Sequence, residues 1–256
     1  MAIDKVKVLD KALSILTLIC ANEELSLKEL EEFSGLNRTT VYRILQSFLN
    51  WGYVEQNLAN KKYRASLKIL EMAGIVLRRI DVVKVARPYL LSLRDESKES
   101  TYVAVLNGFN VVYADWEPSY YDAHITGSVG RSIPAYCTGA GKTILAYLPK
   151  EEVNKLLEKH ELKRYTQNTI TDKDKLKQDL EKTLTRGYGI SIEEFGSDAI
   201  AVAAPIFDIK NKIIASIAVA ALKSRVKGDE HIKNLGGMVK KFASNISKEL
   251  GSTFYK

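Results

Sequence analysis

The segment from Asn37 to Asn50 carries side chains suited to reading a DNA duplex. Asn37 is a good N-cap, and the residues after it predict a helix over 38–50. One face of this helix holds residues that can donate hydrogen bonds to phosphates or base edges. None of them is acidic, as a helix lying in a major groove requires. The expected contact residues are Arg38, Thr39, Thr40, Tyr42, Arg43 and Gln46.

The same helix also has an apolar face, which sets its rotation against the rest of the domain. The apolar residues recur at intervals of three and four, the spacing of a single buried stripe. They are Val41, Ile44, Leu45, Phe48 and Leu49. Burial of this stripe would turn the polar face outward.

A shorter helix and a break are expected before the reading helix. Ser26 and Glu29 have the S-x-x-E spacing of a capping box, in which the two side chains satisfy each other's free backbone N–H groups. A helix should therefore run from Ser26 to Phe33, and Ser34-Gly35 supplies the break. We count Ser26 among the expected DNA contacts.

Two short strands are expected after the reading helix, over 51–56 and 63–65, with a polar and basic tip between them. A helix pair followed by such a hairpin is a winged helix-turn-helix. Lys61, Lys62 and Arg64 should neutralise phosphates, since they cluster at the tip with no acidic neighbour. The alternative is a small helical protein-interaction module whose lysines are solvated.

The distribution of charge agrees with nucleic-acid binding without proving it. The chain of 256 residues has a formal charge of +7. Residues 36–79 hold eight Lys or Arg and two Glu, whereas residues 1–35 hold four basic and seven acidic residues. The positive charge is therefore concentrated on the reading helix and the wing.

Two further helices flank this unit. The first should span 8–20, with one face formed by Leu9, Leu13, Leu16 and Cys20. A second, over 67–80, aligns Leu67, Leu70, Gly74 and Leu77. Its apolar stripe predicts contact with a second subunit, because one reading helix covers only a few base pairs and two address neighbouring half-sites. The alternative is a connector that packs only on its own domain.

The residues from 81 onward have the alternating pattern of an α+β domain with an antiparallel sheet. A helix over 82–98 contains Pro88, which should kink it or split it in two. Further helices are expected over 139–148, 150–160, 173–185 and 229–250. The expected strands are Thr101–Leu106, Val111–Trp116, Asp122–Thr126, Tyr188–Glu194, Ile200–Phe207 and Ile213–Ala220.

The patterns of catalytic and metal sites are missing from this sequence. Residues 138–143 (T-G-A-G-K-T) resemble a phosphate loop, but Tyr136 stands where the pattern needs glycine, so a helix N-terminus facing a cleft is expected instead. Glu193 and Glu194 are adjacent in an expected strand and should point to opposite faces. The three histidines lie in separate elements. We therefore expect no enzyme activity, no cofactor and no metal.

The cysteines and the apolar runs bear on where the protein works. Cys20 and Cys137 lie far apart among apolar or small residues, which favours buried free thiols over a disulfide and fits a reducing cytoplasm. The longest apolar run, residues 213–222, is about half of the ~20 residues that span a bilayer. The chain also begins without an apolar signal-peptide core. These features predict a cytoplasmic protein with no membrane contact.

Two alanine-rich strand segments, residues 199–205 and 215–220, admit two interpretations. Small side chains on neighbouring strands can leave concave space beside a sheet, and the backbone N–H groups of a helix starting near Gly139 could face a ligand there. Alternatively, alanine simply lets a helix pack closely on the sheet. Composition does not separate a pocket from close packing.

Across nearly its whole length the chain resembles the IclR family of bacterial and archaeal transcription regulators. The N-terminal part shares the order of a helix, an S-x-x-E helix, the reading helix N-R-T-T-V-Y-R-I-L-Q and then G-Y-V. The C-terminal part shares G-R-S-I-P-A-Y-C-T-G-A-G-K (130–142), T-I-T-D (169–172), R-G-Y-G (186–189) and the stretch from 193 to 208. This ordered series is specific to the family.

The resemblance implies a domain plan and a set of partners. A winged helix-turn-helix DNA-binding domain would occupy 1–66, a connecting helix 67–80, and a GAF-like effector-binding domain 81–256. The expected partners are a palindromic double-stranded DNA operator, a small-molecule effector, and further copies of the chain in a homodimer or a dimer of dimers. A rival enzyme would use the cleft of residues 130–220, and a rival architectural DNA-binding protein would leave the C-terminal domain empty.

The resemblance also implies where an effector would bind. Relatives that bind small carboxylates use a Gly-Ala pair matching Gly139 and Ala140, an acidic residue at the position of Ser191, and serines at the positions of Ala218 and Ala220. This chain lacks those three polar groups, which favours a bulkier or more apolar compound, including an aromatic one, over a glyoxylate-like acid. The expected effector-binding residues are Ile125, Val129, Gly139, Ala140, Ser191, Ala199, Ala201, Ala218 and Ala220.

Overall fold

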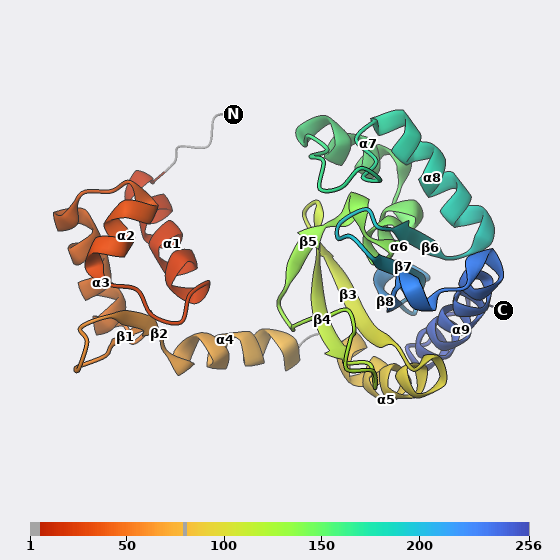
Figure 1. Ribbon diagram of the computed structural model, residues 1–256, viewed down its shortest axis with the longest axis horizontal. Helices are drawn as coiled ribbons and strands as arrows, with labels where there is room; N and C mark the ends of the chain where they lie inside the picture. The colour runs from red at the N-terminus through yellow and green to blue at the C-terminus, as the bar shows by residue number, and fades with distance from the viewer. Residues whose placement is uncertain (1–5, 79–80, 256) are drawn as a thin grey trace. The chain divides into compact units, whose positions relative to one another are not determined.

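The computed structural model describes residues 6–78 and 81–255, with side chains for 6–75 and 82–255. The chain divides between residues 79 and 80 into two compact units, which are described separately (Figure 1). Together they make an α+β protein, as the sequence predicts.

The N-terminal unit is a winged helix-turn-helix. Its elements are α1 (Lys7–Cys20), α2 (Leu27–Ser34), α3 (Arg38–Asn50), β1 (Val54–Gln56), β2 (Tyr63–Ala65) and α4 (Leu67–Arg78). Strands β1 and β2 form the antiparallel wing, and Leu25 pairs with Tyr63 as an isolated bridge. This bridge attaches the loop before α2 to the first residue of β2, next to the tip of the wing.

Helix boundaries in this unit follow the capping residues in the sequence. The Ser26 hydroxyl accepts from the Glu29 N–H, and the Glu29 carboxylate accepts from the Ser26 N–H at 2.7 Å, which is the predicted capping box. Gly35 ends α2 with a φ of 67°, a left-handed conformation that suits glycine. Asn37 caps α3 by accepting from the Thr40 N–H at 2.9 Å. The predicted start of the reading helix is confirmed.

The face of α1 that holds Leu9, Leu13, Leu16 and Cys20 is not the face that packs on the core. Ile15 and Ile19 are the buried residues of this helix, whereas Leu9 and Leu13 are exposed. Cys20 is exposed as well, and only Cys137 is a buried free thiol. The helix has two apolar stripes, and packing on α2, α3 and the wing buries the one that contains the isoleucines.

The C-terminal unit is one antiparallel sheet with helices on both faces. Its strands are β3 (Ser100–Asn107), β4 (Asn110–Glu117), β5 (Ser132–Pro134), β6 (Gly189–Ile192), β7 (Ala199–Phe207) and β8 (Ile213–Leu222), in the spatial order β5-β4-β3-β8-β7-β6. Its helices are α5 (Asp81–Ser97), α6 (Gly139–Tyr147), α7 (Lys150–Lys159), α8 (Lys173–Arg186) and α9 (Gly228–Glu249), with 3₁₀ turns at Ala135–Cys137 and Lys223–Arg225.

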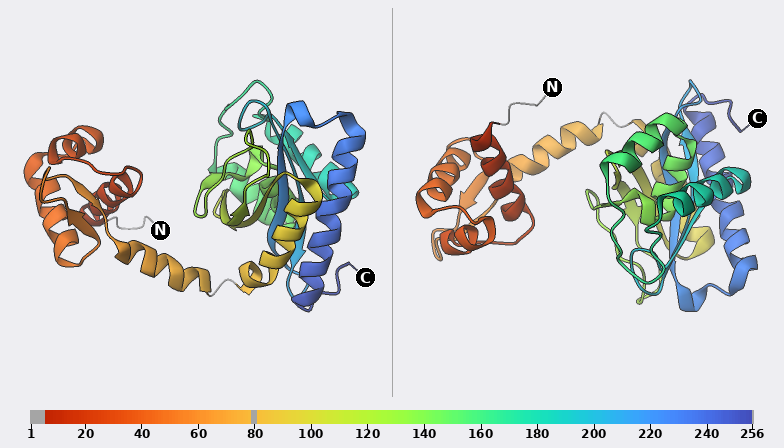
Figure 2. Two further views of the ribbon diagram at one scale, coloured as in Figure 1. Left: turned by 60° about the horizontal axis from the view of Figure 1, so that its bottom comes forward. Right: turned by 90° about the horizontal axis from the view of Figure 1, so that it is seen from above.

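Two hydrophobic layers lie on the two faces of this sheet. Helices α5 and α9 cover one face, and α6 with its neighbours covers the other (Figure 2). Val103, Val202 and Ile217 belong to the layer under α5 and α9. Tyr102, Ala203 and Ala218 belong to the layer under α6. Strand residues therefore alternate between the layers, as the pleat of a sheet requires.

The structure corrects two expectations about the C-terminal unit and narrows a third. Residues 122–126 form a bend and irregular chain instead of a strand, while β5 was not predicted. Of the two outcomes expected at Pro88, a kink or a split, the split does not occur, since one helix runs from Asp81 to Ser97. Glu193 and Glu194 follow β6 in a bend, and the strand itself ends at Ile192.

Two helical glycines should respond oppositely to replacement by alanine. A Cβ on Gly141 would lie 2.2 Å from the Ala135 carbonyl oxygen, whereas a Cβ on Gly237 would meet nothing within 4 Å. We expect Gly237→Ala to raise the free energy of unfolding by about 0.5–1 kcal/mol, because alanine is the better helix former. Gly141→Ala should lower it, because α6 must move away from the chain before it. Denaturant unfolding of both variants checks this, and equal effects would contradict the close approach.

Candidate functional site

The polar face of α3 is turned to solvent, as its apolar stripe predicts. Arg38, Thr39, Tyr42, Arg43 and Gln46 are exposed and Thr40 is half-buried. On the opposite side Val41, Ile44 and Leu45 are buried, while Phe48 and Leu49 are partly buried. Helix α3 contains no acidic residue. This face can therefore donate hydrogen bonds to an anionic duplex without like-charge repulsion.

The wing is less positive than the sequence suggests. Lys62 lies 3.6 Å from Glu29, and Arg64 pairs with Glu55 at 3.2 Å and with Glu24 at 3.9 Å. The expectation of no acidic neighbour was therefore wrong, because the Leu25–Tyr63 bridge and the strand pairing bring these carboxylates to the wing. Within residues 6–75, Lys61 is the wing cation without an ion pair.

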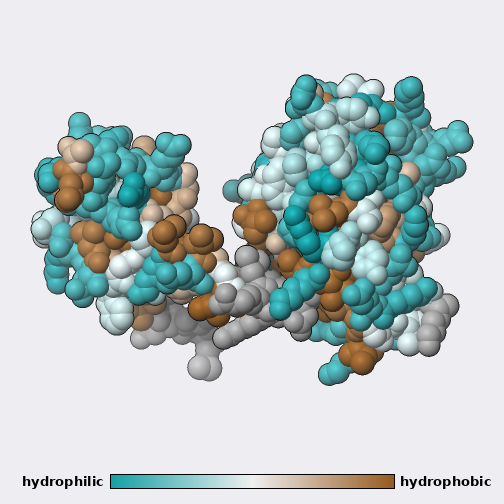
Figure 3. All heavy atoms as spheres, turned by 90° about the horizontal axis from the view of Figure 1, so that it is seen from below, coloured by the Kyte–Doolittle hydropathy of each residue, from teal (hydrophilic) through white to brown (hydrophobic). Residues whose placement is uncertain are grey.

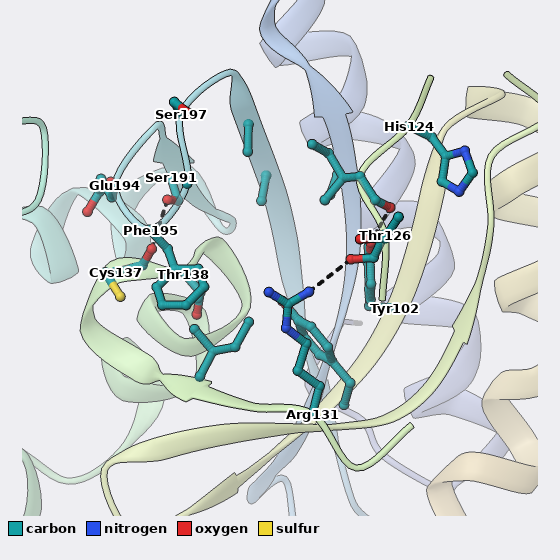
Figure 4. A pocket seen from close by; sticks show the side chains of 17 residues that line it. Tyr102, His124, Thr126, Arg131, Cys137, Thr138, Ser191, Glu194, Phe195 and Ser197 are labelled. Carbon is teal, nitrogen blue, oxygen red and sulfur yellow. Dashed lines mark hydrogen bonds between the residues drawn. The ribbon is translucent and has the colours of Figure 1, made fainter. Parts of the chain in front are cut away.

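A cavity of about 280 Å³ lies in the C-terminal unit, between the sheet and the loops at one end of it (Figure 4). Its walls come from β3, β4, the chain between β4 and β5, the start of α6, the loop after β6, and β7 with β8. Ile125, Ser191, Ala199, Ala201 and Ala220, all predicted effector-binding residues, line it.

The other four predicted effector-binding residues do not line this cavity. A Cβ on Gly139 would lie 2.7 Å from the Ala201 carbonyl oxygen, so this glycine lets α6 pack directly on β7. The Ala140 carbonyl accepts from the Ser216 hydroxyl, and Ala218 lies in the core under α6. Val129 is exposed on the loop before β5. The alanine-rich strands thus serve both alternatives, since some alanines line the cavity and others allow close packing.

The cavity contains an arginine that the prediction of a less polar pocket missed. Figure 4 shows the Arg131 guanidinium pointing into the cavity, where one of its N–H groups donates to the Thr126 carbonyl at 3.1 Å. Among residues 82–255 no carboxylate forms an ion pair with it. The stretch G-R-S-I-P that carries Arg131 was read only as a family landmark, and nothing local indicated which way this side chain points.

Aromatic rings form another part of the cavity wall. The Tyr102 and Tyr113 ring centroids are 4.7 Å apart, and Phe195 lies across the cavity from Tyr102. The Tyr102 hydroxyl donates to the Ile125 carbonyl at 2.8 Å, which holds the chain between β4 and β5 against the sheet. Burial raises the pKa of Tyr113 to about 12, so its phenol is neutral at physiological pH.

A buried lysine anchors the loop after β6. Lys142 on α6 is almost fully buried, with its ammonium 2.5 Å from Glu194 and 2.8 Å from Asp179 on α8. Burial raises the pKa of the Glu194 carboxyl, although the lysine opposes this shift. Glu193 instead pairs with Lys223, so the two glutamates point apart, although they lie in the bend after β6 and not in the predicted strand. In Figure 4 the Glu194 carboxylate is directed away from Arg131.

Comparisons with known proteins agree on one family. Residues 8–58 match the IclR helix-turn-helix domain, and residues 74–248 match the C-terminal domain of the bacterial transcriptional regulator IclR. The chain belongs to the IclR family of transcriptional regulators. It is 30% identical to the HTH-type transcriptional regulator KdgR of Escherichia coli over 248 residues, which cover 97% of this chain and 94% of KdgR.

Solved structures of IclR regulators have the same fold. The Thermotoga maritima IclR structure matches with a TM-score of 0.77 and 29% identity, covering 97% of this chain and all of the other. An IclR homologue from Microbacterium hydrocarbonoxydans, complexed with 4-hydroxybenzoate, matches with a TM-score of 0.81 and 19% identity, covering 95% of this chain and 98% of the other. This IclR-family chain therefore has a DNA-binding unit followed by an effector-binding domain.

Of the helices in residues 6–78 and 81–255, none could span a membrane.

Replacing the buried lysine tests the anchoring of the cavity loop. Lys142→Met should lower the free energy of unfolding by about 3–5 kcal/mol, because Glu194 and Asp179 lose the cation between them. Since burial raises the pKa of Glu194, the stability that this group contributes is present at low pH and lost as pH rises. The loss of unfolding free energy in Lys142→Met should thus be largest at neutral pH, where Glu194 is charged without its lysine. It should shrink on acidification, because protonation removes that buried charge.

Denaturant unfolding across pH measures this deficit. The control is Lys177→Met, because Lys177 pairs with Asp174 at 3.9 Å on the exposed side of α8. Its effect should stay below about 1 kcal/mol. A Lys142→Met deficit that did not change with pH would argue against the buried carboxylates as its cause.

Proposed function

We propose that this IclR-family protein binds a palindromic operator as a dimer or a dimer of dimers, and that an effector in the cavity modulates this binding. The observation that carries the proposal is the combination of an acid-free, solvent-facing α3 with a cavity in the other unit that holds the Arg131 guanidinium, which forms no ion pair with any carboxylate of residues 82–255. DNA binding and ligand binding can then be separated by mutation.

The proposed operator contacts come from α2, α3 and the wing. Side chains of α3 read base edges, while Ser26 and the wing cations contact phosphates. Lys61 is the strongest wing candidate, because Lys62 and Arg64 must exchange nearby carboxylates for phosphates. Such exposed pairs are worth little, so this exchange costs little.

Two exposed apolar surfaces support the proposed dimer. Val8, Leu9 and Leu13 are exposed on α1. Leu67 and Leu70 on α4 are 73% and 66% exposed, which disfavours a connector that packs only on its own domain. Figure 3 shows such hydrophobic side chains among the hydrophilic surface of the N-terminal unit. A second copy would bury them and supply the second reading helix.

The cavity is proposed to bind a compound with an apolar or aromatic body and an anionic group. Tyr102, Tyr113 and Phe195 suit the body, and Arg131 suits a carboxylate. Its volume is near the lower end for ligand sites. The homologue complexed with 4-hydroxybenzoate binds a compound of this kind, although its low identity argues only for the fold.

Two rivals make different predictions. An architectural DNA-binding protein would protect DNA without discrete sites, whereas the proposed regulator should give discrete footprints. An enzyme would need a catalytic cluster at the cavity, and the Ser191 hydroxyl there donates to the Cys137 carbonyl instead of to a catalytic partner. We therefore propose a non-enzymatic regulator that acts on DNA in the cytoplasm.

The reading helix is tested by Arg43→Ala and Gln46→Ala. Each change should weaken operator binding by about 1–3 kcal/mol where the side chain contacts a base, without changing the melting temperature, because both residues are exposed. Fluorescence anisotropy with a footprinted operator at fixed salt measures the affinity. The control is Lys155→Ala, which removes one positive charge from the exposed side of α7 in the other unit. If both α3 variants bound the operator with wild-type affinity, the assignment of α3 as the reading helix would be wrong.

The cavity is tested by Ala201→Leu, because Ala201 lines it and Ala218, the residue suggested by family resemblance, does not. The larger side chain should abolish the response to an effector while leaving ligand-free operator binding intact. Overpacking can cost about 1–3 kcal/mol, so a thermal melt must show that the variant folds. Val129→Leu, outside the cavity, is the control. An effector that shifts operator affinity equally in wild type and folded Ala201→Leu would bind elsewhere.

A further inference from the structure

Strand β4 contains an irregularity next to the cavity. Along the β3–β4 pair, Tyr113 is opposite Ala104, but Asp115 is opposite Val103, so β4 has one extra residue, Ala114. Such a β-bulge shifts the alternation of side chains by one position. Bulges are frequent beside functional sites because they re-aim side chains.

The bulge divides the side chains of β4 between the two faces of the sheet. Tyr113 and Trp116 join the layer under α6, where both rings pack near Tyr102 in the cavity wall. Asp115 lies opposite Val103, which belongs to the layer under α5 and α9. Uninterrupted alternation would place residues 113, 115 and 117 on one face. With the bulge, Tyr113 and Trp116 lie on the cavity face, and Asp115 and Glu117 lie on the α5 face.

On the face toward α5, the carboxylates of Asp115 and Glu117 form ion pairs with two arginines of that helix. Arg87 donates to Asp115 at 2.9 Å and also to Glu117. Arg94 donates to the other oxygen of Glu117 at 2.9 Å and also pairs with Asp95 on its own helix. The Asp115 and Glu117 side chains are only 13% exposed, so solvent screens these pairs less than surface pairs.

The segment after β4, residues 120–126, also contacts both α5 and residues that line the cavity. Tyr120 donates to Asp95 on α5 at 2.6 Å, and its ring lies under the Arg94 guanidinium. Further along, Ile125 and Thr126 line the cavity and accept from Tyr102 and Arg131. The same segment therefore contacts α5 at one end and the cavity at the other.

We infer that the ion pairs of Arg87 and Arg94 with Asp115 and Glu117 couple occupancy of the cavity to α5, and through it to the connecting helix that leads to the DNA-binding unit. Helix α5 begins at Asp81, three residues after α4 ends at Arg78. None of the four residues lines the cavity, so they are positioning residues. This inference rests on the proposed function and adds the route by which the effector acts.

The test is a coupling factor, the ratio of operator dissociation constants with and without saturating ligand. Benzoate, 4-hydroxybenzoate and phenylacetate are the probes, and calorimetry gives their own affinities. Glu117→Gln keeps the side-chain shape but removes the charge shared by both arginines. It should reduce the coupling factor at least about threefold, while probe affinity without DNA and operator affinity without probe stay at wild-type values.

A matched control is available on the same helix. Glu96 of α5 pairs with Lys241 of α9 at 2.9 Å, on the side away from β4. Glu96→Gln removes an α5 ion pair of similar length and should keep the wild-type coupling factor. If Glu117→Gln fails to fold by thermal melt, Arg87→Gln replaces it, because that side chain is 44% exposed and easier to change.

The outcomes separate this inference from the proposed function. A wild-type coupling factor of one for every probe contradicts the proposed function, and the inference falls with it. A wild-type factor above one that Glu117→Gln retains, or that Glu96→Gln reduces as much, overturns the inference alone. Loss confined to Glu117→Gln and Arg87→Gln supports it.

Discussion

Lys142 is a buried positive charge in the C-terminal unit, and such a charge needs negatively charged groups beside it. Its ammonium brings Glu194 from the cavity loop and Asp179 from α8 to the first turns of α6. A hydrophobic contact could slide by an ångström at little cost, but an uncompensated buried charge could not. The loop that forms one wall of the cavity is therefore fixed in place, and the cavity has a defined shape before any ligand arrives.

The opposite wall is held by a different device. Backbone pairing fixes β4 against β3, and the bulge at Ala114 puts Asp115 on the opposite face of the sheet from Tyr113. Rings on one face meet the cavity, and carboxylates on the other bind α5. One wall of the cavity is thus anchored by the buried Lys142. The other wall is connected to α5, the helix that follows the connecting helix, through ion pairs that solvent partly screens. Such pairs can rearrange more readily than a buried one.

The N-terminal unit balances charge in another way. Its reading helix has no acidic residue, whereas the wing carries cations with carboxylates beside them. The Glu24 carboxylate accepts from Asn57 and Asn60, hydrogen bonds that lower its pKa and hold the wing against the loop before α2. The wing therefore has a defined position in the absence of DNA, and its free charge is limited chiefly to Lys61.

The sequence by itself determined the features that depend on neighbours along the chain. The capping residues Ser26 and Asn37 set helix starts, and the spacing of Val41, Ile44 and Leu45 set the rotation of α3. Most strands and helices of the α+β unit followed from the same local periodicity. Only the tertiary structure decided which stripe of α1 is buried, that residues 122–126 form a loop over the cavity, and that Arg131 points into it. It also decided which carboxylates meet Lys142 and the wing. These outcomes depend on contacts between residues far apart in the chain, whose energies no local pattern records.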